Sequence, residues 1–283
     1  MESTAQQQTE EIKTEETKQV TEKLQYKTTR DYFEDSYKFV SKGTLLDLWL
    51  TDKGDEHVLV LDRTIFHPQG GGQPSDEGFI TSVDGKVKFI IKNLQHKDDA
   101  ILHIGTYEQD GEVFERGQEL LLNVDELKRR AYARYHSAGH LLDVAMQRAG
   151  QTQLKPGKGY HFTSGAYVEY IGNVDNSVKD KLVKELTIVA NQIIQEQQGV
   201  EKGVWSKNCT YEEAGEALKE GVPSYIPKGQ DLRVIKLTDE DSGCPCGGTH
   251  VKHVTDIVEI EITKIIKKGK NTRVSYTLKD KSS

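Results

Sequence analysis

The stretch Asp125-Glu-Leu-Lys-Arg-Arg-Ala-Tyr-Ala-Arg-Tyr-His-Ser-Ala-Gly-His140 decides how the second half of this chain folds. Asp125 suits a helix N-terminus, because its carboxylate can accept hydrogen bonds from the free N–H groups of the first turn. Apolar residues then recur at helical spacing to about Ala149. We therefore predict a long helix with His136 and His140 in its middle. Side chains four residues apart lie on one face of a helix, so both can bind one ion.

A second pair of candidate metal ligands lies in Cys244-Pro-Cys-Gly-Gly-Thr-His250. Cys246 and His250 are again four residues apart, and the glycines between them allow a turn tight enough to bring both to one point. Imidazole and thiolate in a set of four ligands are typical of Zn²⁺. We predict one Zn²⁺ per chain, held by His136, His140, Cys246 and His250. Cys244 stays open as an alternative ligand, and the ligand count does not decide between a closed structural zinc and a functional one.

A glycine-rich loop, His67-Pro-Gln-Gly-Gly-Gly-Gln-Pro74, precedes both pairs. It matches neither the Walker A pattern nor the dinucleotide-binding fingerprint. Three consecutive glycines allow a bulky ligand to approach the backbone closely, and Gln73 adds an amide that can donate and accept hydrogen bonds. The alternative is a flexible β-turn without a role in binding.

The first half of the chain shows short β-like runs separated by turn signals. The expected strands are 44–50, 57–61, 78–83, 86–91 and 119–124, which suggest a small barrel. Further strands at 165–170, 232–237, 257–266 and 272–278 are interleaved with the histidine helix and with a second helix that Asp175 can cap. The predicted fold class is α+β. We expect a disordered polar tail at 1–27, a β-barrel domain with the glycine-rich loop at 28–124, and an α+β metal-binding domain at 125–283.

The formal net charge of −7 does not favour attraction of nucleic acid by the whole protein, so an RNA-binding surface would have to be local. Two groups of basic residues qualify. One is Lys155 with Lys158, in the loop expected after the histidine helix, and the other comprises Lys264, Lys267, Lys268, Lys270 and Arg273. The alternative is that both groups are merely solvated surface.

The sequence has no apolar run near the ~18 residues that span a bilayer. Its N-terminus is acidic and rich in glutamine, unlike a secretory or mitochondrial leader. We therefore expect a cytoplasmic protein without a membrane partner, in which Cys246 stays reduced and free to bind metal.

At these motifs the chain resembles the freestanding alanyl-tRNA editing proteins, the AlaX family, which are similar to the editing domain of alanyl-tRNA synthetase. The resemblance rests on His136-x-x-x-His140, Cys246-x-x-x-His250 and Pro68-Gln-Gly-Gly-Gly-Gln-Pro-Ser-Asp76, and it runs from about Asp31 to Leu278. It implies a trans-editing hydrolase of the medium-length class. Such a protein cleaves the ester that joins serine, and in some members glycine, to the tRNA for alanine.

The resemblance also implies roles for single residues. His136, His140, Cys246 and His250 become the zinc ligands, and the pocket is formed by Gly70, Gly71, Gly72 and Gln73. A site that accepts serine and rejects alanine is easiest to build around a hydrogen bond to the serine hydroxyl. Gln73 and Thr249 are the candidate partners for that hydroxyl, and Lys155 and Lys158 are the candidate contacts to the mischarged tRNA.

Two other functions stay open: a zinc-stabilised tRNA-binding module without catalysis, and a metallohydrolase that acts on a small ester or amide. The ATP-binding aminoacylation domain of a synthetase is not found in this sequence, so we do not expect a synthetase. Asp143 and Glu169 are acidic residues near the candidate site in sequence, but no general base can be named from the sequence.

Overall fold

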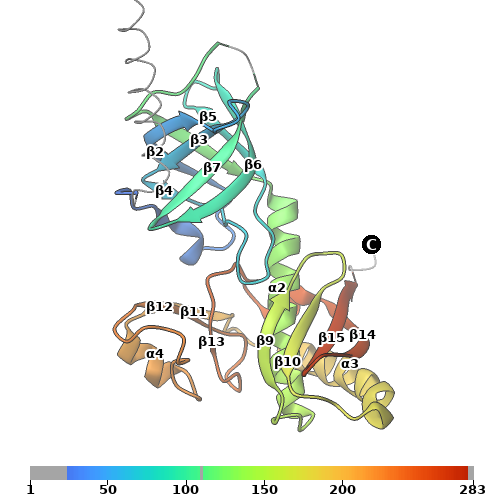
Figure 1. Cartoon of the computed structure of the whole chain (residues 1–283). Coiled ribbons are helices and arrows are strands. Elements are labelled where there is room, and N and C mark those ends of the chain that lie inside the picture. The colour runs from blue at the N-terminus through green and yellow to red at the C-terminus, as the bar shows by residue number, and fades with distance from the viewer. Residues whose placement is uncertain (1–23, 109–110, 280–283) are drawn as a thin grey trace, which may run out of the picture.

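A computed structural model describes residues 24–108 and 111–279 of this chain. Figure 1 shows a β-barrel at one end, an α+β part at the other, and helix α2 (Glu126–Arg148) leading from the first to the second. The predicted α+β class with an N-terminal barrel is therefore confirmed. Residues 1–23 of the expected tail lie outside the described residues, whereas Leu24 and Tyr26 pack against a cluster of barrel side chains. Within the described ranges, no helix is both long and apolar enough to cross a membrane.

Six antiparallel strands close the barrel in the order β2-β3-β7-β6-β5-β8. The strands are β2 (Val40–Leu50), β3 (His57–Leu61), β5 (Gly78–Ser82), β6 (Lys88–Lys97), β7 (Ala100–Tyr107) and β8 (Glu119–Val124). Two short strands, β1 (Thr29–Arg30) and β4 (Arg63–Thr64), pair beside them in parallel. The barrel encloses a core in which Leu45, Phe66, Ile80 and Phe89 are fully buried. The glycine-rich loop connects β4 to β5 at the barrel end that faces α2 (Figure 1).

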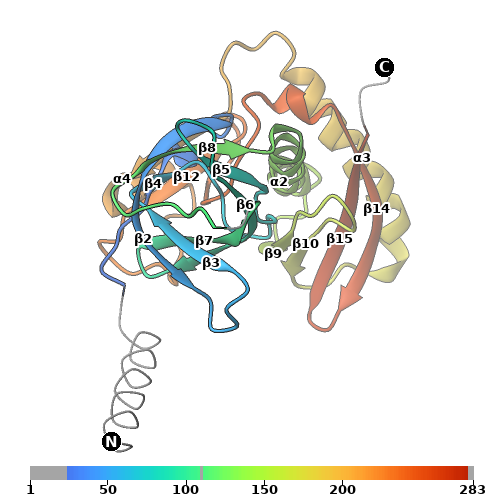
Figure 2. The same ribbon diagram turned by 90° about the horizontal axis from the view of Figure 1, so that it is seen from above.

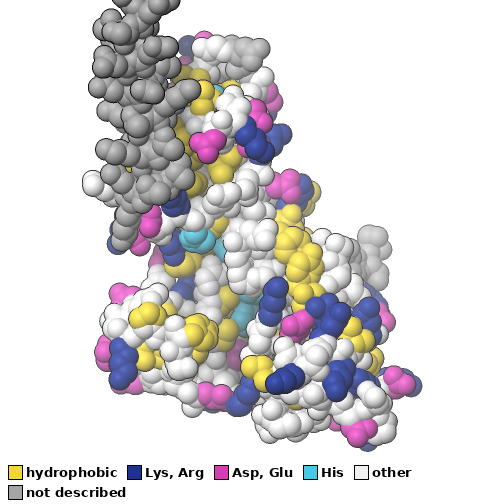
Figure 3. Space-filling view, viewed as in Figure 1, with side chains coloured by type: hydrophobic (Ala, Val, Ile, Leu, Met, Phe, Trp, Pro, Cys, Tyr) yellow, Lys and Arg dark blue, Asp and Glu magenta, His cyan; other side chains and the backbone are white. Residues whose placement is uncertain are grey.

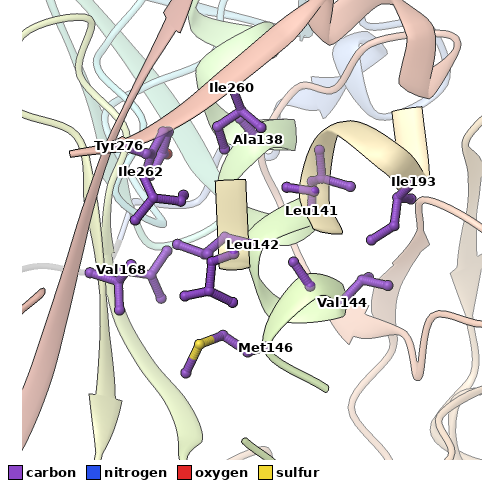
Figure 4. Packing of buried hydrophobic residues seen from close by; sticks show 14 of the residues in the cluster. Ala138, Leu141, Leu142, Val144, Met146, Val168, Ile193, Ile260, Ile262 and Tyr276 are labelled. Carbon is purple, nitrogen blue, oxygen red and sulfur yellow. The ribbon is translucent and has the colours of Figure 1, made fainter. Parts of the chain in front are cut away.

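A four-stranded antiparallel sheet with the order β14-β15-β10-β9 forms the centre of the second half. Its strands are β9 (Lys155–Tyr160), β10 (Tyr167–Ile171), β14 (Glu259–Lys268) and β15 (Asn271–Lys279). Figures 1 and 2 show α2 and α3 (Lys179–Glu196) on one face of this sheet. Their apolar stripes meet the sheet in one core, where Leu141 and Leu142 of α2 lie close to Ile193 of α3 and Ile262 of β14 (Figure 4).

A smaller lobe carries the cysteine motif. Strands β11 (Trp205–Cys209), β12 (Leu232–Lys236) and β13 (Cys244–Pro245) form a three-stranded antiparallel sheet, and helix α4 (Tyr211–Ala217) packs beside it. Thr210 and Glu213 start α4 with a reciprocal capping box, which satisfies free N–H groups at its N-terminus. The pairing of Ile235 with Cys244 places the following turn next to α2.

A buried ion pair joins α2 to the barrel. Both Arg129 and Asp76 are enclosed, and Nε of Arg129 donates to Oδ1 of Asp76 over 2.8 Å while its Nη2 donates to Oδ2. Further N–H groups of Arg129 donate to the carbonyl oxygens of Ser36 and Ile65. Asp76 in turn accepts from the backbone N–H of His67. A buried charge pair is tolerated when its remaining hydrogen-bonding groups are satisfied, so this pair fixes both ends of the glycine-rich loop against α2.

The structure corrects the prediction of a loop that contains Lys155 and Lys158. Both residues lie on β9, which pairs only with β10 at the edge of the four-stranded sheet. An edge strand tolerates proline and glycine, so Lys-Pro-Gly-Lys-Gly-Tyr forms a strand although its composition favours a turn. Asp175 caps as expected, but it starts a short 3-10 helix (Asn176–Val178) from which α3 continues.

Candidate functional site

The structure brings the two predicted ligand pairs together. One ligand atom from each of His136, His140, Cys246 and His250 lies within 4.8 Å of the others. The histidines of α2 occupy consecutive turns, and their rings stack with centroids 5.1 Å apart. Nε2 of His136 and Nε2 of His250 each lie 3.4 Å from Sγ of Cys246. This group could hold a metal ion, as the spacing in the sequence predicted.

Gln73 of the glycine-rich loop orients His136. Its side chain is fully buried, and its Oε1 accepts a hydrogen bond from the backbone N–H of Thr249 over 2.9 Å. Because a backbone N–H can only donate, that contact identifies the Gln73 atom as oxygen. Nδ1 of His136 lies 2.8 Å from the same oxygen and must therefore carry a proton. Nε2 of His136 is then left as a lone pair toward Cys246, the arrangement that metal binding requires.

The other two histidines are also prepared for binding. Nδ1 of His250 lies 3.2 Å from Oγ of Ser137, a residue of α2, so its Nε2 is the nitrogen that faces Cys246. Nε2 of His140 is buried and has no hydrogen-bond partner among the described residues. A buried ring nitrogen without a partner is unfavourable, and a metal ion is one group that would satisfy it.

The cysteine turn is shaped by Arg233 and Gly248. Nη1 of Arg233 donates to the carbonyl oxygens of Cys246 and Gly248 over 3.1 and 2.8 Å, and the backbone N–H of Cys246 donates to the carbonyl of Arg233. A Cβ on Gly248 would lie only 2.1 Å from Cε1 of His136. Glycine is therefore needed at this position because the turn passes directly over the ring of a ligand.

Electrostatics favour the metal-binding forms of three of the four side chains. Burial lowers the pKa of His136 and of His250 well below the ordinary value, so both rings are neutral at pH 7. Burial alone would raise the pKa of Cys246, but His140 and the backbone N–H of Gly248 stabilise the thiolate and lower it. His140 is the exception: burial would lower its pKa, but Cys244 and Cys246 raise it well above the ordinary value, so the ring must lose a proton before it can bind a metal. Thiolate and neutral imidazole are the species that coordinate metals.

The glycine-rich loop is an ordered turn. Gly70 and Gln73 exchange two backbone hydrogen bonds, and Gly71 and Gly72 between them have φ of +56° and +83°. A two-residue turn of this kind requires positive φ at both central positions, which favours glycine. A Cβ on Gly72 would also lie 2.5 Å from the carbonyl oxygen of Gly159 on β9. The glycines therefore meet a structural need as well as leaving space above the turn.

A cavity of about 860 Å³ opens above the candidate ligands. Figure 3 shows a histidine side chain in the hollow between the small lobe and the β9–β10 hairpin. Among the predicted site residues, the cavity is lined by Gly70, Gly71, Gly72, Lys158, His136, His140 and Cys246. Cys244 also lines the cavity, but the convergent group of candidate ligands contains Cys246 and not Cys244. Gln73 and Thr249 are fully buried, and Nε2 of Gln73 donates to Oγ1 of Thr249 over 2.8 Å. Their contact with a substrate stays a prediction.

The basic residues are not equivalent. Lys158 is exposed at the cavity, whereas Nζ of Lys155 pairs with Glu220 at 2.7 Å. Arg273 pairs with Glu169 at 2.7 Å and lies over the ring of Tyr167. Of these three residues, Lys158 is the one that lines the cavity. Binding of tRNA by Lys155 and Lys158 stays a prediction.

Two polar residues of the cavity were not assigned a role from the sequence. Asp143 lines it one turn beyond His140, where Tyr170 donates a 2.7 Å hydrogen bond to its carboxyl group and burial raises its pKa to about 6. His161 lines it just after β9. Its ring stacks on that of His136 with centroids 4.6 Å apart. His161 lies outside both four-residue pairs in the sequence, so its spacing gave no signal, and the tertiary fold brings it to the site.

Known proteins match this chain over both halves. The family described as tRNA synthetases class II (A) matches residues 1–128, and the family described as Threonyl and Alanyl tRNA synthetase second additional domain matches residues 232–273. The alanyl-tRNA editing protein AlaX-L of Pyrococcus horikoshii is 29% identical over 250 residues, which are 88% of this chain and 57% of that protein. The Cys246–His250 turn lies within the residues matched by the second of these two families.

Alanine–tRNA ligases are matched at similar identity. Those of Haloquadratum walsbyi and Halobacterium salinarum are 30% and 31% identical over 240 and 241 residues. These alignments cover 83% and 82% of this chain but only 24% of each ligase. The chain thus spans about a quarter of the ligases and somewhat over half of AlaX-L. On the matched families, the shared region and the convergent ligand group, the chain belongs with the alanyl-tRNA editing proteins and the related region of the alanine–tRNA ligases.

Proposed function

We propose that this chain is a trans-editing deacylase. It hydrolyses the ester that joins a wrong amino acid to the tRNA for alanine, with serine as the main substrate and glycine as a second one. The observation that carries the proposal is that a convergent group of four candidate metal ligands and an ordered glycine turn lie at one cavity of about 860 Å³, which three of the four ligands line. That volume falls within the usual range of small-molecule sites. The name of the AlaX-L relative, alanyl-tRNA editing protein, points to the same substrate class.

We propose Zn²⁺ as the metal, with one ion per chain. Three imidazoles and one thiolate combine the nitrogen and sulfur ligands that Zn²⁺ prefers, in the number that a tetrahedral site takes. Ordinary Zn–N and Zn–S lengths in a tetrahedral site separate nitrogen from sulfur by about 3.5 Å, close to the 3.4 Å between Cys246 Sγ and Nε2 of both His136 and His250. When bound, the ion would neutralise the thiolate and fix the four side chains, which organises the wall of the cavity.

The protein's own groups then need to supply orientation more than acid–base strength, because an aminoacyl ester is already labile. The backbone of Gly70 and Gly71 is open to the cavity, so the aminoacyl group and terminal ribose can approach it closely. Lys158 provides a positive charge at the cavity for the phosphate backbone. Within this scheme the barrel at 28–124 and the metal-binding part at 125–283 act as two domains that share one site.

Three substrates test this proposal with the metal-loaded protein: serine attached to the tRNA for alanine, the same tRNA correctly charged with alanine, and a small seryl ester. A deacylase of the proposed kind releases serine from tRNA much faster than alanine and acts poorly on the small ester. Equal activity on the small ester would instead identify a metallohydrolase of small substrates. Tight tRNA binding without release of either amino acid would identify a binding module.

A further inference from the structure

His161 is a histidine of the cavity that does not belong to the convergent ligand group. Its side chain is 5% exposed, and its ring lies 4.6 Å from that of His136, at an interplanar angle of 17°. It lies among the residues that line the cavity, together with the glycine turn. It therefore faces the space in which the proposed ester would lie.

Three glycines from three different segments make room for this ring. A Cβ would lie 2.3 Å from Cε1 of His161 if placed on Gly139, 2.2 Å from Nε2 if placed on Gly159, and 3.0 Å from Cδ2 if placed on Gly72. The backbone N–H of His161 also donates to the carbonyl oxygen of Gly72 over 2.8 Å. Glycine is unfavourable inside a helix, yet Gly139 lies in the middle of α2. The close approach of His161 explains why glycine stands there.

A hydrogen-bond chain fixes which nitrogen of His161 carries the proton. Oη of Tyr276 donates its single proton to the carbonyl oxygen of Tyr135 over 2.8 Å. The same oxygen lies 2.7 Å from Nδ1 of His161, so it must accept there and Nδ1 must donate. Nε2 is then a lone pair. It has no hydrogen-bond partner within the described parts of the chain, it passes close to the backbone of Gly159, and its ring belongs to the lining of the cavity.

We propose that Nε2 of His161 accepts a hydrogen bond from the water molecule that attacks the ester. This inference rests on the proposed deacylase function and names a catalytic residue for it. The water oxygen forms a bond to the carbonyl carbon, and the bond from that carbon to the ribose oxygen breaks. The water proton ends on the ribose oxygen, so free amino acid and tRNA are the products and no proton stays on His161. The fixed lone pair aims the water and excludes other orientations.

Two substitutions separate this role from a structural one. In His161→Asn, the shorter amide can still donate to Tyr276, but it no longer reaches the position of Nε2. In His161→Gln, the amide oxygen reaches that position and can accept. His103→Asn is the matched control, because His103 is a fully buried histidine of the barrel bonded to Thr64 and Leu59. Single-turnover release should fall by about 100-fold in His161→Asn, recover partly in His161→Gln, and stay near wild type in His103→Asn at equal metal content.

The identity of the hydrogen-bond donor is tested with seryl-, glycyl- and lactyl-tRNA. The same loss on all three in His161→Asn supports the attacking water, because neither the serine hydroxyl nor the α-ammonium group is present in all three substrates. A loss confined to seryl-tRNA would assign Nε2 to the serine hydroxyl, and a loss absent from lactyl-tRNA would assign it to the α-ammonium group. Either result overturns the proposal, as does wild-type activity of His161→Asn on all three.

The proton position can be measured without any substrate. Nitrogen chemical shifts of the metal-loaded protein, assigned by comparison with His161→Gln, should show His161 neutral and protonated at Nδ1. The Tyr276→Phe variant should shift this signal, because Nδ1 loses its acceptor. A proton on Nε2 would overturn the proposal even if the protein is an active deacylase. Failure of wild type to release any amino acid, with the expected nitrogen shifts, would refute the deacylase function instead.

Discussion

Replacing Gln73 with alanine tests whether the glycine-rich loop holds a metal ligand in place. The variant loses three buried hydrogen bonds and leaves two donors without acceptors, Nδ1–H of His136 and the backbone N–H of Thr249. Each buried unsatisfied donor costs about 1–3 kcal/mol, so the free energy of unfolding should fall by about 2–6 kcal/mol. His136 also loses the partner that fixes its tautomer, which typically weakens metal binding by about 10- to 100-fold.

Metal affinity is measured by competition with a chromophoric chelator, and stability by chemical denaturation of the metal-free protein. Thr249→Val is the matched control, because it removes the acceptor of Gln73 Nε2 but keeps the contact between Gln73 and His136. Its stability should fall by about 1–3 kcal/mol while its metal affinity stays near that of wild type. Wild-type metal affinity in Gln73→Ala would refute the reasoning and leave direct contact with the substrate as the role of Gln73.

Three further predictions follow from the structure. Cys246→Ala should lose most of the bound metal by elemental analysis whereas Cys244→Ala keeps it, because only Cys246 belongs to the convergent group; the opposite result would reassign the ligand. Lys158→Glu should weaken tRNA binding and lower the slope of log affinity against log salt concentration by about one unit. The control is Lys264→Glu on the exposed side of β14, which should have a smaller effect in the same binding titrations. Equal effects would mean that the cavity lysine has no special role. Burial lowers the pKa of His103 to about 4, below its ordinary value of 6.5, so the unfolded chain binds a proton in that window that the folded chain does not. Stability should therefore fall by about 3 kcal/mol as pH drops from 6.5 to 4, and denaturation of His103→Gln should show a shallower fall; identical pH curves would contradict this account.

Local signals in the sequence predicted much of the fold. Asp125 caps α2 as expected, with its carboxylate accepting from the backbone N–H of Lys128, and β3 and β8 have the predicted bounds. These features depend on the residues' own neighbours in sequence. Strand β7 was not predicted, because nearly all of its residues are buried and its side chains do not alternate between apolar and polar. The composition of β9 predicts a loop, but its pairing with β10, and not its composition, makes it a strand.

The part of the candidate site that could be predicted is the part whose residues have a regular spacing in the sequence. The four-residue spacing of His136–His140 and of Cys246–His250 predicts that each pair can bind one ion, and the fold brings the two pairs together. Arg129 and His161 gave no such signal. Arg129 is one of several arginines on the same helix, and its buried partner Asp76 is 53 residues away. The setting of His161 depends on glycines and tyrosines from four segments, which only the tertiary structure assembles.

The most direct test of the central claim is a ratio of two single-turnover rates. The metal-loaded protein is mixed with one tRNA for alanine charged either with serine or with alanine, and the release of each amino acid is followed with enzyme in excess. A site that recognises the serine hydroxyl through a buried hydrogen bond should release serine faster than alanine. The ratio of the two rates should lie between about 10 and about 10⁴. Equal release of the two amino acids, or release of neither, would contradict the assignment of this cavity as an editing site.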